Sequence, residues 1–176
     1  MGSYMIEYYK KGSKIMRIAV LTVSDRCSRK ETQDLSGPLI SELMQSVCET
    51  AEYKIVPDER EKIADALIDF CDRLQADIVF TTGGTGFAPR DVTPEATEDV
   101  IEKRAPGIPE AIRAESLKIT PRAMLSRATA GIRGKTLIIN LPGSPKAVRE
   151  SLAVVMPVLE HALETLSGQT LSCGKG

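Results

Sequence analysis

Residues 76–94 read Ala-Asp-Ile-Val-Phe-Thr-Thr-Gly-Gly-Thr-Gly-Phe-Ala-Pro-Arg-Asp-Val-Thr-Pro, which joins an apolar run to a glycine-rich loop and then to a proline. The run Ile78 to Phe80 is bounded by turn-forming residues, as expected for a strand buried in a sheet. Thr93-Pro94 then offers a capping residue and a proline at the first position of a helix. The stretch therefore predicts a strand, a loop at its carboxyl end and a helix.

The same order of elements recurs along the chain. Apolar runs rich in β-branched residues predict strands at residues 18–23, 53–56, 77–81 and 136–140. Helix-start residues and apolar residues at helical spacing predict helices from Ser36, over residues 63–74, from Thr93 and from Ser144. Residues 131–134 are predicted to form a turn. This alternation predicts an α/β fold of three layers, with a mostly parallel central sheet and helices on both faces.

The length of the chain fits one domain, because 176 residues allow one well-buried core but leave little room for a second. We expect an N-terminal arm or leader at residues 1–15, a single domain at residues 16–168 and a C-terminal tail at residues 169–176. No stretch approaches the ~20 apolar residues of a membrane span. Four cysteines without a C-x-x-C pair favour a reducing compartment. We therefore expect a cytoplasmic protein with no membrane partner.

Charge and aromatic content argue against a nucleic-acid partner. The net charge is -1, so no basic field exists that would gather nucleic acid. Aromatic residues make up 4% of the chain and tryptophan is absent, which removes the stacking platforms that single-strand binders use. We therefore expect small-molecule ligands that are bound locally.

Four polar loops are expected at one edge of the sheet, where the carboxyl ends of parallel strands form ligand sites. They are residues 24–25, 57–58, 83–91 and 140–146. Three of these loops carry an aspartate directly after the apolar run or its glycine turn. This convergence predicts a binding site at that edge.

The glycine loop predicts an anion site, because glycine lets backbone N–H groups approach a ligand closely. The expected contacts are consecutive residues, Thr82, Gly83, Gly84 and Thr85. Asp58 and Asp91 are the predicted ligands of Mg²⁺, since two carboxylates can share a hard cation with phosphate oxygens. The alternative is a tight turn at Asp91 and a helix cap at Asp58.

Other loop residues are weaker candidates. Ser24 and Asp25 either hydrogen-bond a polar group of the ligand or form only a strand-end turn. Ser144 lies at a helix start, where it either helps to bind phosphate or simply caps the helix. Ser126 precedes Arg127, whose guanidinium either meets a phosphate or stays in solvent.

The chain lacks an obvious catalytic base. Its only histidine, His161, lies in the last predicted helix, far in sequence from every loop named above. Transfer of a nucleotidyl group to a phosphate needs no strong base, because that nucleophile is already anionic. The sequence therefore favours this chemistry over a Ser-His-Asp mechanism.

Six ordered motifs together resemble a known family. They are Val23-Ser24-Asp25, Val56-Pro57-Asp58, the glycine loop at 81–86, residues 89–97, Ser126-Arg127 with Gly131, and residues 140–145. This combination resembles the molybdopterin adenylyltransferase family (MogA/MoaB type) of molybdenum cofactor biosynthesis. The likeness extends from Arg17 to about Gly168.

The resemblance implies an enzyme that transfers AMP from Mg-ATP to the terminal phosphate of molybdopterin, giving adenylyl-molybdopterin and pyrophosphate. It places the essential acidic positions on Asp58 and Asp91. It places the nucleotide and pterin contacts on the glycine loop, on Ser24 and Asp25, on Ser126, and on the turn that contains Pro142, Gly143 and Ser144.

The resemblance also implies a homotrimer or hexamer and a downstream metal-insertion enzyme as a partner. Ile119, Met124 and Leu125 are apolar residues outside the predicted helix faces and agree with oligomerisation. The chain lacks a segment that some members insert after the Leu-Pro-Gly turn. A catalytically weak molybdopterin-binding paralogue or scaffold is therefore the alternative function, although retention of both aspartates favours an active enzyme.

Overall fold

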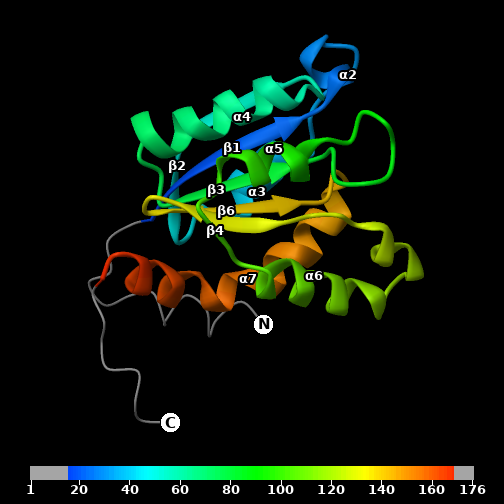
Figure 1. The fold of residues 1–176 in the computed structure, drawn as a ribbon. Coiled ribbons are helices and arrows are strands. Elements are labelled where there is room, and N and C mark those ends of the chain that lie inside the picture. The colour runs from blue at the N-terminus through cyan, green and yellow to red at the C-terminus, as the bar shows by residue number, and fades with distance from the viewer. Residues whose placement is uncertain (1–15, 169–176) are drawn as a thin grey trace.

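The computed structural model describes residues 16–168, and its strands and helices alternate along the chain (Figure 1). Its elements are, in order, β1 (Met16–Val23), α2 (Asp25–Ser28), α3 (Ser36–Met44), β2 (Cys48–Val56), α4 (Arg60–Ile68), a π-helical turn (Asp69–Arg73), β3 (Ile78–Thr82), α5 (Thr93–Val100), β4 (Lys103–Arg104), α6 (Gly107–Leu117), a 3-10 turn (Pro121–Leu125), β5 (Ala130–Arg133), β6 (Thr136–Leu141) and α7 (Pro145–Leu166). The predicted arm and tail lie outside the described residues.

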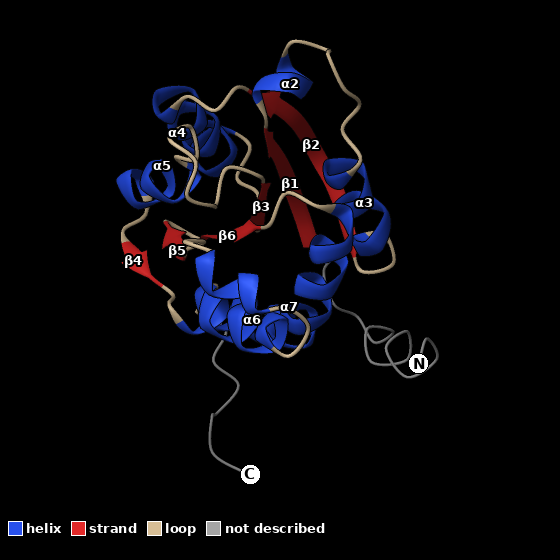
Figure 2. Ribbon diagram, turned by 90° about the vertical axis from the view of Figure 1, so that its right-hand side faces the viewer, coloured by secondary structure: helices blue, strands red, loops and turns tan. Residues whose placement is uncertain are grey.

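The central sheet has the strand order β2-β1-β3-β6-β5-β4. Strands β2, β1, β3 and β6 are parallel, whereas β5 and β4 are antiparallel to their neighbours. Helices α4 and α5 cover one face, and α3, α6 and α7 cover the other (Figure 2). The predicted three-layer α/β fold with a mostly parallel sheet is confirmed.

Alternate residues of β1 face the two helical layers. Ile18 and Val20 pack in the core under α3, α6 and α7, whereas Ala19 and Leu21 pack in the core under α4 and α5. All four side chains are fully buried. An interior parallel strand is covered on both faces, so it appears in the sequence as an unbroken apolar run.

Helix α7 follows the prediction closely. Ser144 caps it by accepting a hydrogen bond from the Ala147 N–H, and Pro145 is its first residue. Its buried face includes Val148 and Leu152, as predicted. Within residues 16–168, none of the helices has both the length and the apolar character that crossing a bilayer requires.

The prediction of a turn at residues 131–134 was wrong, because most of this segment forms β5. The turn lies one step later, where Gly134 has a positive φ of 56° and, with Lys135, connects β5 to β6 as a hairpin. Gly131 lies against Ile101, and an added Cβ would come within 2.6 Å of the Ile101 Cδ1 atom. The glycine therefore serves close packing inside the sheet rather than a turn.

The start of α5 also differs from the prediction that Thr93 caps it. Thr93 is the first helical residue, and the cap position is Val92, which makes no side-chain cap bond. The Thr93 hydroxyl is buried and donates to the Gly83 carbonyl oxygen at 2.9 Å. The first residue of α5 packs against the loop, so the Thr93 hydroxyl bonds to the loop backbone instead of accepting a hydrogen bond from a helical N–H.

A buried amide connects α5 to the sheet. The Asn140 side chain on β6 is 1% exposed, and its Nδ2 donates to the hydroxyls of Thr81 and Thr97 at 3.0 and 2.9 Å. Its Oδ1 accepts the Thr129 N–H at 3.2 Å. Strand β3, helix α5 and the segment before β5 are therefore held by one side chain whose polar groups are all satisfied.

We expect Asn140→Ala to lower the free energy of unfolding by roughly 1–3 kcal/mol, because it leaves buried polar groups without partners. Chemical denaturation of the purified protein measures this loss. Lys135→Ala is the control, since Lys135 is exposed in the neighbouring turn and should change stability by less than about 0.5 kcal/mol. A loss for Asn140→Ala no larger than that of the control would contradict the structural role of the amide.

Candidate active site

The carboxyl ends of β2, β1, β3 and β6 meet at one edge of the sheet, and β1 and β3 form the point where strand order reverses. The glycine loop leaves β3 there. Gly83 and Gly84 have positive φ angles of 97° and 63°. An added Cβ would lie 2.3 Å from the Val23 carbonyl oxygen at Gly83, and 2.3 Å from the Thr93 hydroxyl at Gly84. Only glycine fits both positions, because conformation and space each exclude a side chain.

Asp25 and Asp58 connect the ends of β1 and β2. The Asp25 N–H donates to Asp58 Oδ2 at 2.7 Å, and the Asp58 N–H donates to Asp25 Oδ1 at 3.1 Å. Asp58 does not cap α4, whose cap position is Glu59. The second Asp58 oxygen, Oδ1, lies 3.2 Å from the place that a Cβ on Gly84 would occupy. The carboxylate therefore reaches the glycine loop.

Asp91 lies at the other end of the same loop. Its Oδ2 accepts the Ala88 N–H at 2.9 Å and lies 2.8 Å from the place of a Cβ on Gly86. Burial raises the pKa of Asp58, and the negative charges of Asp25 and Asp91 raise it further. The predicted pair is thus brought to one loop, close enough for Asp91 to disfavour ionisation of Asp58.

Arg90 pairs with the third carboxylate of the edge. Its Nε and Nη2 donate to the two Asp25 oxygens at 2.9 and 2.7 Å. This hydrogen-bonded ion pair holds the pKa of Asp25 below its usual value. The Asp25 carboxylate is therefore already engaged within the protein, and Ser24 accepts a hydrogen bond from the Cys27 N–H as the cap of α2.

The turn after β6 packs against the glycine loop. The Thr82 hydroxyl donates to the Pro142 carbonyl oxygen at 2.7 Å, and a Cβ on Gly143 would lie 3.3 Å from Gly83 Cα. The Ser36 hydroxyl donates to the Gly143 carbonyl oxygen at 2.8 Å. The structure therefore places the predicted residues of the two glycine-containing loops next to each other.

A cavity of about 280 Å³ adjoins this edge, between the glycine loop, α6, the 3-10 turn and the start of α7. Three predicted contacts line it, namely Thr85, Ser126 and Pro142. Most of the remaining surface is apolar, with Ile112 and Leu125 among the lining residues. A mainly apolar cavity with a few polar residues suits a small organic ligand.

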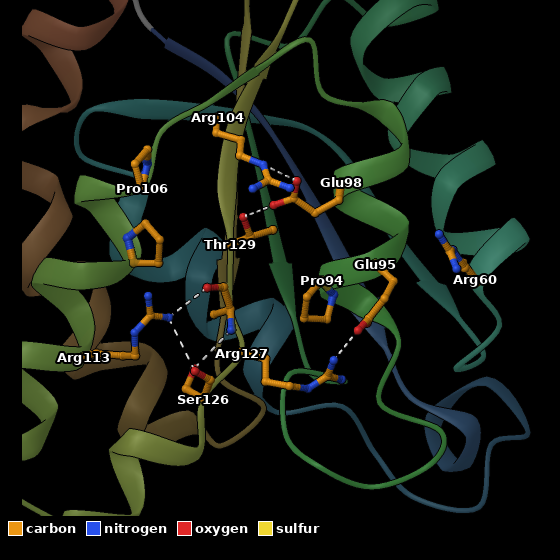
Figure 3. A pocket seen from close by; sticks show the side chains of 12 residues that line it. Arg60, Pro94, Glu95, Glu98, Arg104, Pro106, Arg113, Ser126, Arg127 and Thr129 are labelled. Atoms are coloured by element: carbon orange, nitrogen blue, oxygen red, sulfur yellow. Dashed lines mark hydrogen bonds and ion pairs between the residues drawn. The ribbon is translucent and has the colours of Figure 1, made fainter.

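A second cavity, of about 490 Å³, lies on the other side of Ser126 (Figure 3). Its walls are charged and come from α4, α5, β4 and α6. Arg104 donates to Glu98, and Arg127 forms an ion pair with Glu95. Ser126 and Arg127 are the predicted candidates among its lining residues, and neither Asp58 nor Asp91 lines it.

Sequence reasoning missed two residues that shape the site. Arg90 lies inside the quoted motif, but only the fold brings it to Asp25. Asp34 bonds to the N–H groups of Ser36 and Gly37 at the start of α3 and accepts from the Tyr53 hydroxyl. The position of Asp34, two residues before the predicted helix start at Ser36, could have indicated this role, because aspartate often bonds to N–H groups at a helix start.

The two carboxylates fit a hard divalent cation, which prefers oxygen ligands. A bound cation would favour the charged form of Asp58, whose pKa is raised by burial and, to a lesser extent, by the charges of Asp25 and Asp91. In the described part of the chain, no cluster of three or more His, Cys, Asp or Glu side chains is arranged to hold a metal. Oxygens from a substrate and from water would therefore complete the coordination.

We expect Asp58→Asn to raise the melting temperature of the ligand-free protein near pH 7. The asparagine oxygen can still accept the Asp25 N–H, while the disfavoured charge is removed. Because the folded-state pKa of Asp58 is raised above its unfolded-state value, the penalty on stability grows as the pH rises from the unfolded-state pKa and is complete above the folded-state pKa. The difference between the two proteins should therefore shrink as the pH falls below it.

Thermal unfolding at neutral and acidic pH measures this difference. Asp65→Asn on the exposed face of α4 is the matched control and should leave the melting temperature unchanged. An equal or lower melting temperature of Asp58→Asn at pH 7 would show that the ionised Asp58 carboxylate does not destabilise the folded protein.

Comparison with known proteins gives a consistent result. Residues 19–161 match the family described as "Probable molybdopterin binding domain". The chain is 49% identical to the molybdopterin adenylyltransferase of Helicobacter pylori, over 87% of this chain and 89% of that protein. It is 41% identical to the enzyme of the same name from Escherichia coli, over 78% and 72% of the two chains.

Solved structures agree with this result. The molybdopterin biosynthesis enzyme MoaB from Thermus thermophilus superposes with a TM-score of 0.83 at 47% identity, covering 89% of this chain and 99% of that one. Fold, motifs and identity over most of the chain lead to one conclusion. The chain belongs to the molybdopterin adenylyltransferase family of molybdenum cofactor biosynthesis proteins.

Proposed function

We propose that this protein acts in molybdenum cofactor biosynthesis as a molybdopterin adenylyltransferase. It transfers AMP from ATP to the terminal phosphate of molybdopterin and releases pyrophosphate. The observation that carries the proposal is the placement of the Asp58 and Asp91 carboxylates against one glycine loop, at Gly84 and Gly86. The names of the relatives at 41 and 49% identity support the same activity.

The reaction forms one bond and breaks another. An oxygen of the molybdopterin phosphate attacks the α-phosphorus of ATP, and the bond from that phosphorus to the bridging oxygen of the β-phosphate breaks. The attacking phosphate is already anionic, so no histidine or other base has to remove a proton. The protein has to align the two substrates and stabilise the charge that shifts to the leaving pyrophosphate.

Asp58 and Asp91 would hold the Mg²⁺ that accompanies ATP. When bound, this ion would neutralise phosphate charge. The residues of the chain do the positioning: Gly83 and Gly84 expose backbone that can approach the phosphates, because no side chain stands in the way. Thr82 holds the neighbouring turn through its bond to Pro142.

The apolar cavity next to the loop would hold the pterin. Thr85, Ser126 and Pro142 line it, and the first two of these residues carry hydroxyl groups. The remaining predicted contacts, Ser24, Asp25, Gly143 and Ser144, belong to the nucleotide side of the edge in this proposal. Ser24 and Ser144 would contribute as helix caps at the ends of β1 and β6, and Asp25 through its pair with Arg90.

The proposal also covers the domain boundaries, the cellular location and the oligomeric state of the protein. We infer a single functional domain over residues 16–168, a cytoplasmic location and a homotrimer or hexamer that passes its product to a metal-insertion enzyme. Exposed apolar side chains support self-association, since Ile119, Met124 and Leu125 are 54, 63 and 46% exposed within one segment.

Purified protein incubated with Mg-ATP and molybdopterin should release pyrophosphate. Asp91→Asn should lower kcat by at least about 100-fold, as expected when one group that stabilises transferring charge is removed. Asp65→Asn, on an exposed face of α4, should keep wild-type turnover. Pyrophosphate release in a coupled assay and circular dichroism of both variants measure the result.

Two outcomes would contradict the proposal. Undiminished turnover of Asp91→Asn would reject the role of this carboxylate. Binding of molybdopterin in calorimetry without pyrophosphate release by the wild-type protein would instead favour the catalytically weak paralogue.

A further inference from the structure

The Arg127 side chain lies against the glycine loop rather than in solvent. Its Nε donates to the Gly86 carbonyl oxygen at 2.7 Å, its Nη2 donates to the Asp91 carbonyl oxygen, and its Nη1 pairs with Glu95 on α5. Figure 3 shows the guanidinium pointing to Glu95 at the border of the charged cavity. In addition, the Arg127 N–H donates to the Thr85 carbonyl oxygen at 2.9 Å.

These contacts close the loop from Gly86 to Asp91. One planar group binds the carbonyl oxygens at both ends, so it fixes the distance between them. Within the loop, the backbone of Asp91 and Ala88 is joined by an N–H to carbonyl bond of 2.8 Å, and the Asp91 carboxylate accepts the Ala88 N–H. The position of this carboxylate therefore depends on a loop whose ends Arg127 holds.

We propose that Arg127 is a positioning residue that sets the place of the Asp91 carboxylate by closing the loop from residue 86 to residue 91. The inference rests on the proposed function, in which Asp91 acts on the nucleotide. In this role Arg127 acts on the protein rather than on a substrate phosphate, because Nε, Nη1 and Nη2 each donate a hydrogen bond to the protein.

The proposal distinguishes arginine from lysine. A lysine ammonium is a compact charge on a flexible stem and cannot span the Gly86 and Asp91 carbonyls together with Glu95. It would, however, still attract a phosphate. Arg127→Lys therefore separates loop positioning from charge attraction.

We expect Arg127→Lys to lower kcat for pyrophosphate release by about 10–100-fold, the size of loss that a displacement of about 1 Å can cause. The KM for molybdopterin should change by less than about threefold, because no substrate contact is lost. The Mg²⁺ concentration at half-maximal rate should rise. Arg60→Lys is the matched control, since Arg60 lines the same cavity but its guanidinium donates to Asp99 rather than to the loop.

A second, milder variant tests the same contact in case Arg127→Lys does not fold properly. The Glu95 carboxylate accepts a hydrogen bond from Arg127 Nη1, and this pair connects Glu95 to the guanidinium that holds the loop. Glu95→Gln should therefore cause a smaller loss of kcat in the same direction, with KM again unchanged.

Hydrogen–deuterium exchange of the ligand-free protein gives a readout that does not depend on turnover. The amides of Ala88 and Asp91 should exchange at least several-fold faster in Arg127→Lys than in wild type and in Arg60→Lys, because both form bonds inside the closed loop. Unchanged exchange with unchanged kcat would overturn the proposal. A raised KM with unchanged kcat and exchange would also overturn it and make Arg127 a substrate ligand.

The exchange measurement separates this inference from the proposed function. A wild-type protein without pyrophosphate release would refute the proposed function. Faster exchange of Ala88 and Asp91 in Arg127→Lys would still support the role of Arg127 in holding the loop, and unchanged exchange would refute it.

Discussion

The site depends on close backbone packing at the ends of three parallel strands. Gly83 is in close contact with both neighbouring loops, because a Cβ on Gly83 would lie 2.3 Å from the Val23 carbonyl oxygen and a Cβ on Gly143 would lie 3.3 Å from Gly83 Cα. This contact joins β1, β3 and β6 at the edge where the chain reverses its strand order. Because the loop lies so close to the sheet, the aspartates that follow β2 and the glycine loop reach one small region. Without this packing, the acidic residues would belong to separate loops.

Electrostatics then give the three carboxylates of the edge different properties. Arg90 stabilises the charge of Asp25, whereas burial and two acidic neighbours oppose the charge of Asp58. Asp91 contributes to that repulsion while its own carboxylate is held by the Ala88 N–H. In the absence of ligand, the ionised form of Asp58 lowers the stability of the fold. The same carboxylate is available to bind a cation, and functional sites often combine these two properties.

Secondary structure could be predicted from the sequence where the local residue pattern matches the burial of the element in the fold. β1, β3 and β6 are buried on both faces, so their apolar runs identified them, and Ser144-Pro145 marked α7 correctly. The prediction failed at β5, whose Ala-Gly-Ile-Arg sequence forms a strand by pairing with β4 and β6. The candidate acids could be named from loop positions, but the partners of Arg90 and Arg127 could not, because both lie more than 30 residues away in the chain.

The chain of bonds from Asn140 through Thr97 and Thr93 ends at the Gly83 carbonyl oxygen. These hydrogen bonds anchor the start of the glycine loop to buried side chains, although the loop itself lies at the edge of the sheet. A segment anchored in this way has little conformational entropy left to lose when a ligand arrives. Ligand recognition at this edge therefore follows a preformed shape more than induced fit, and the entropic cost of ordering the loop is met when the protein folds.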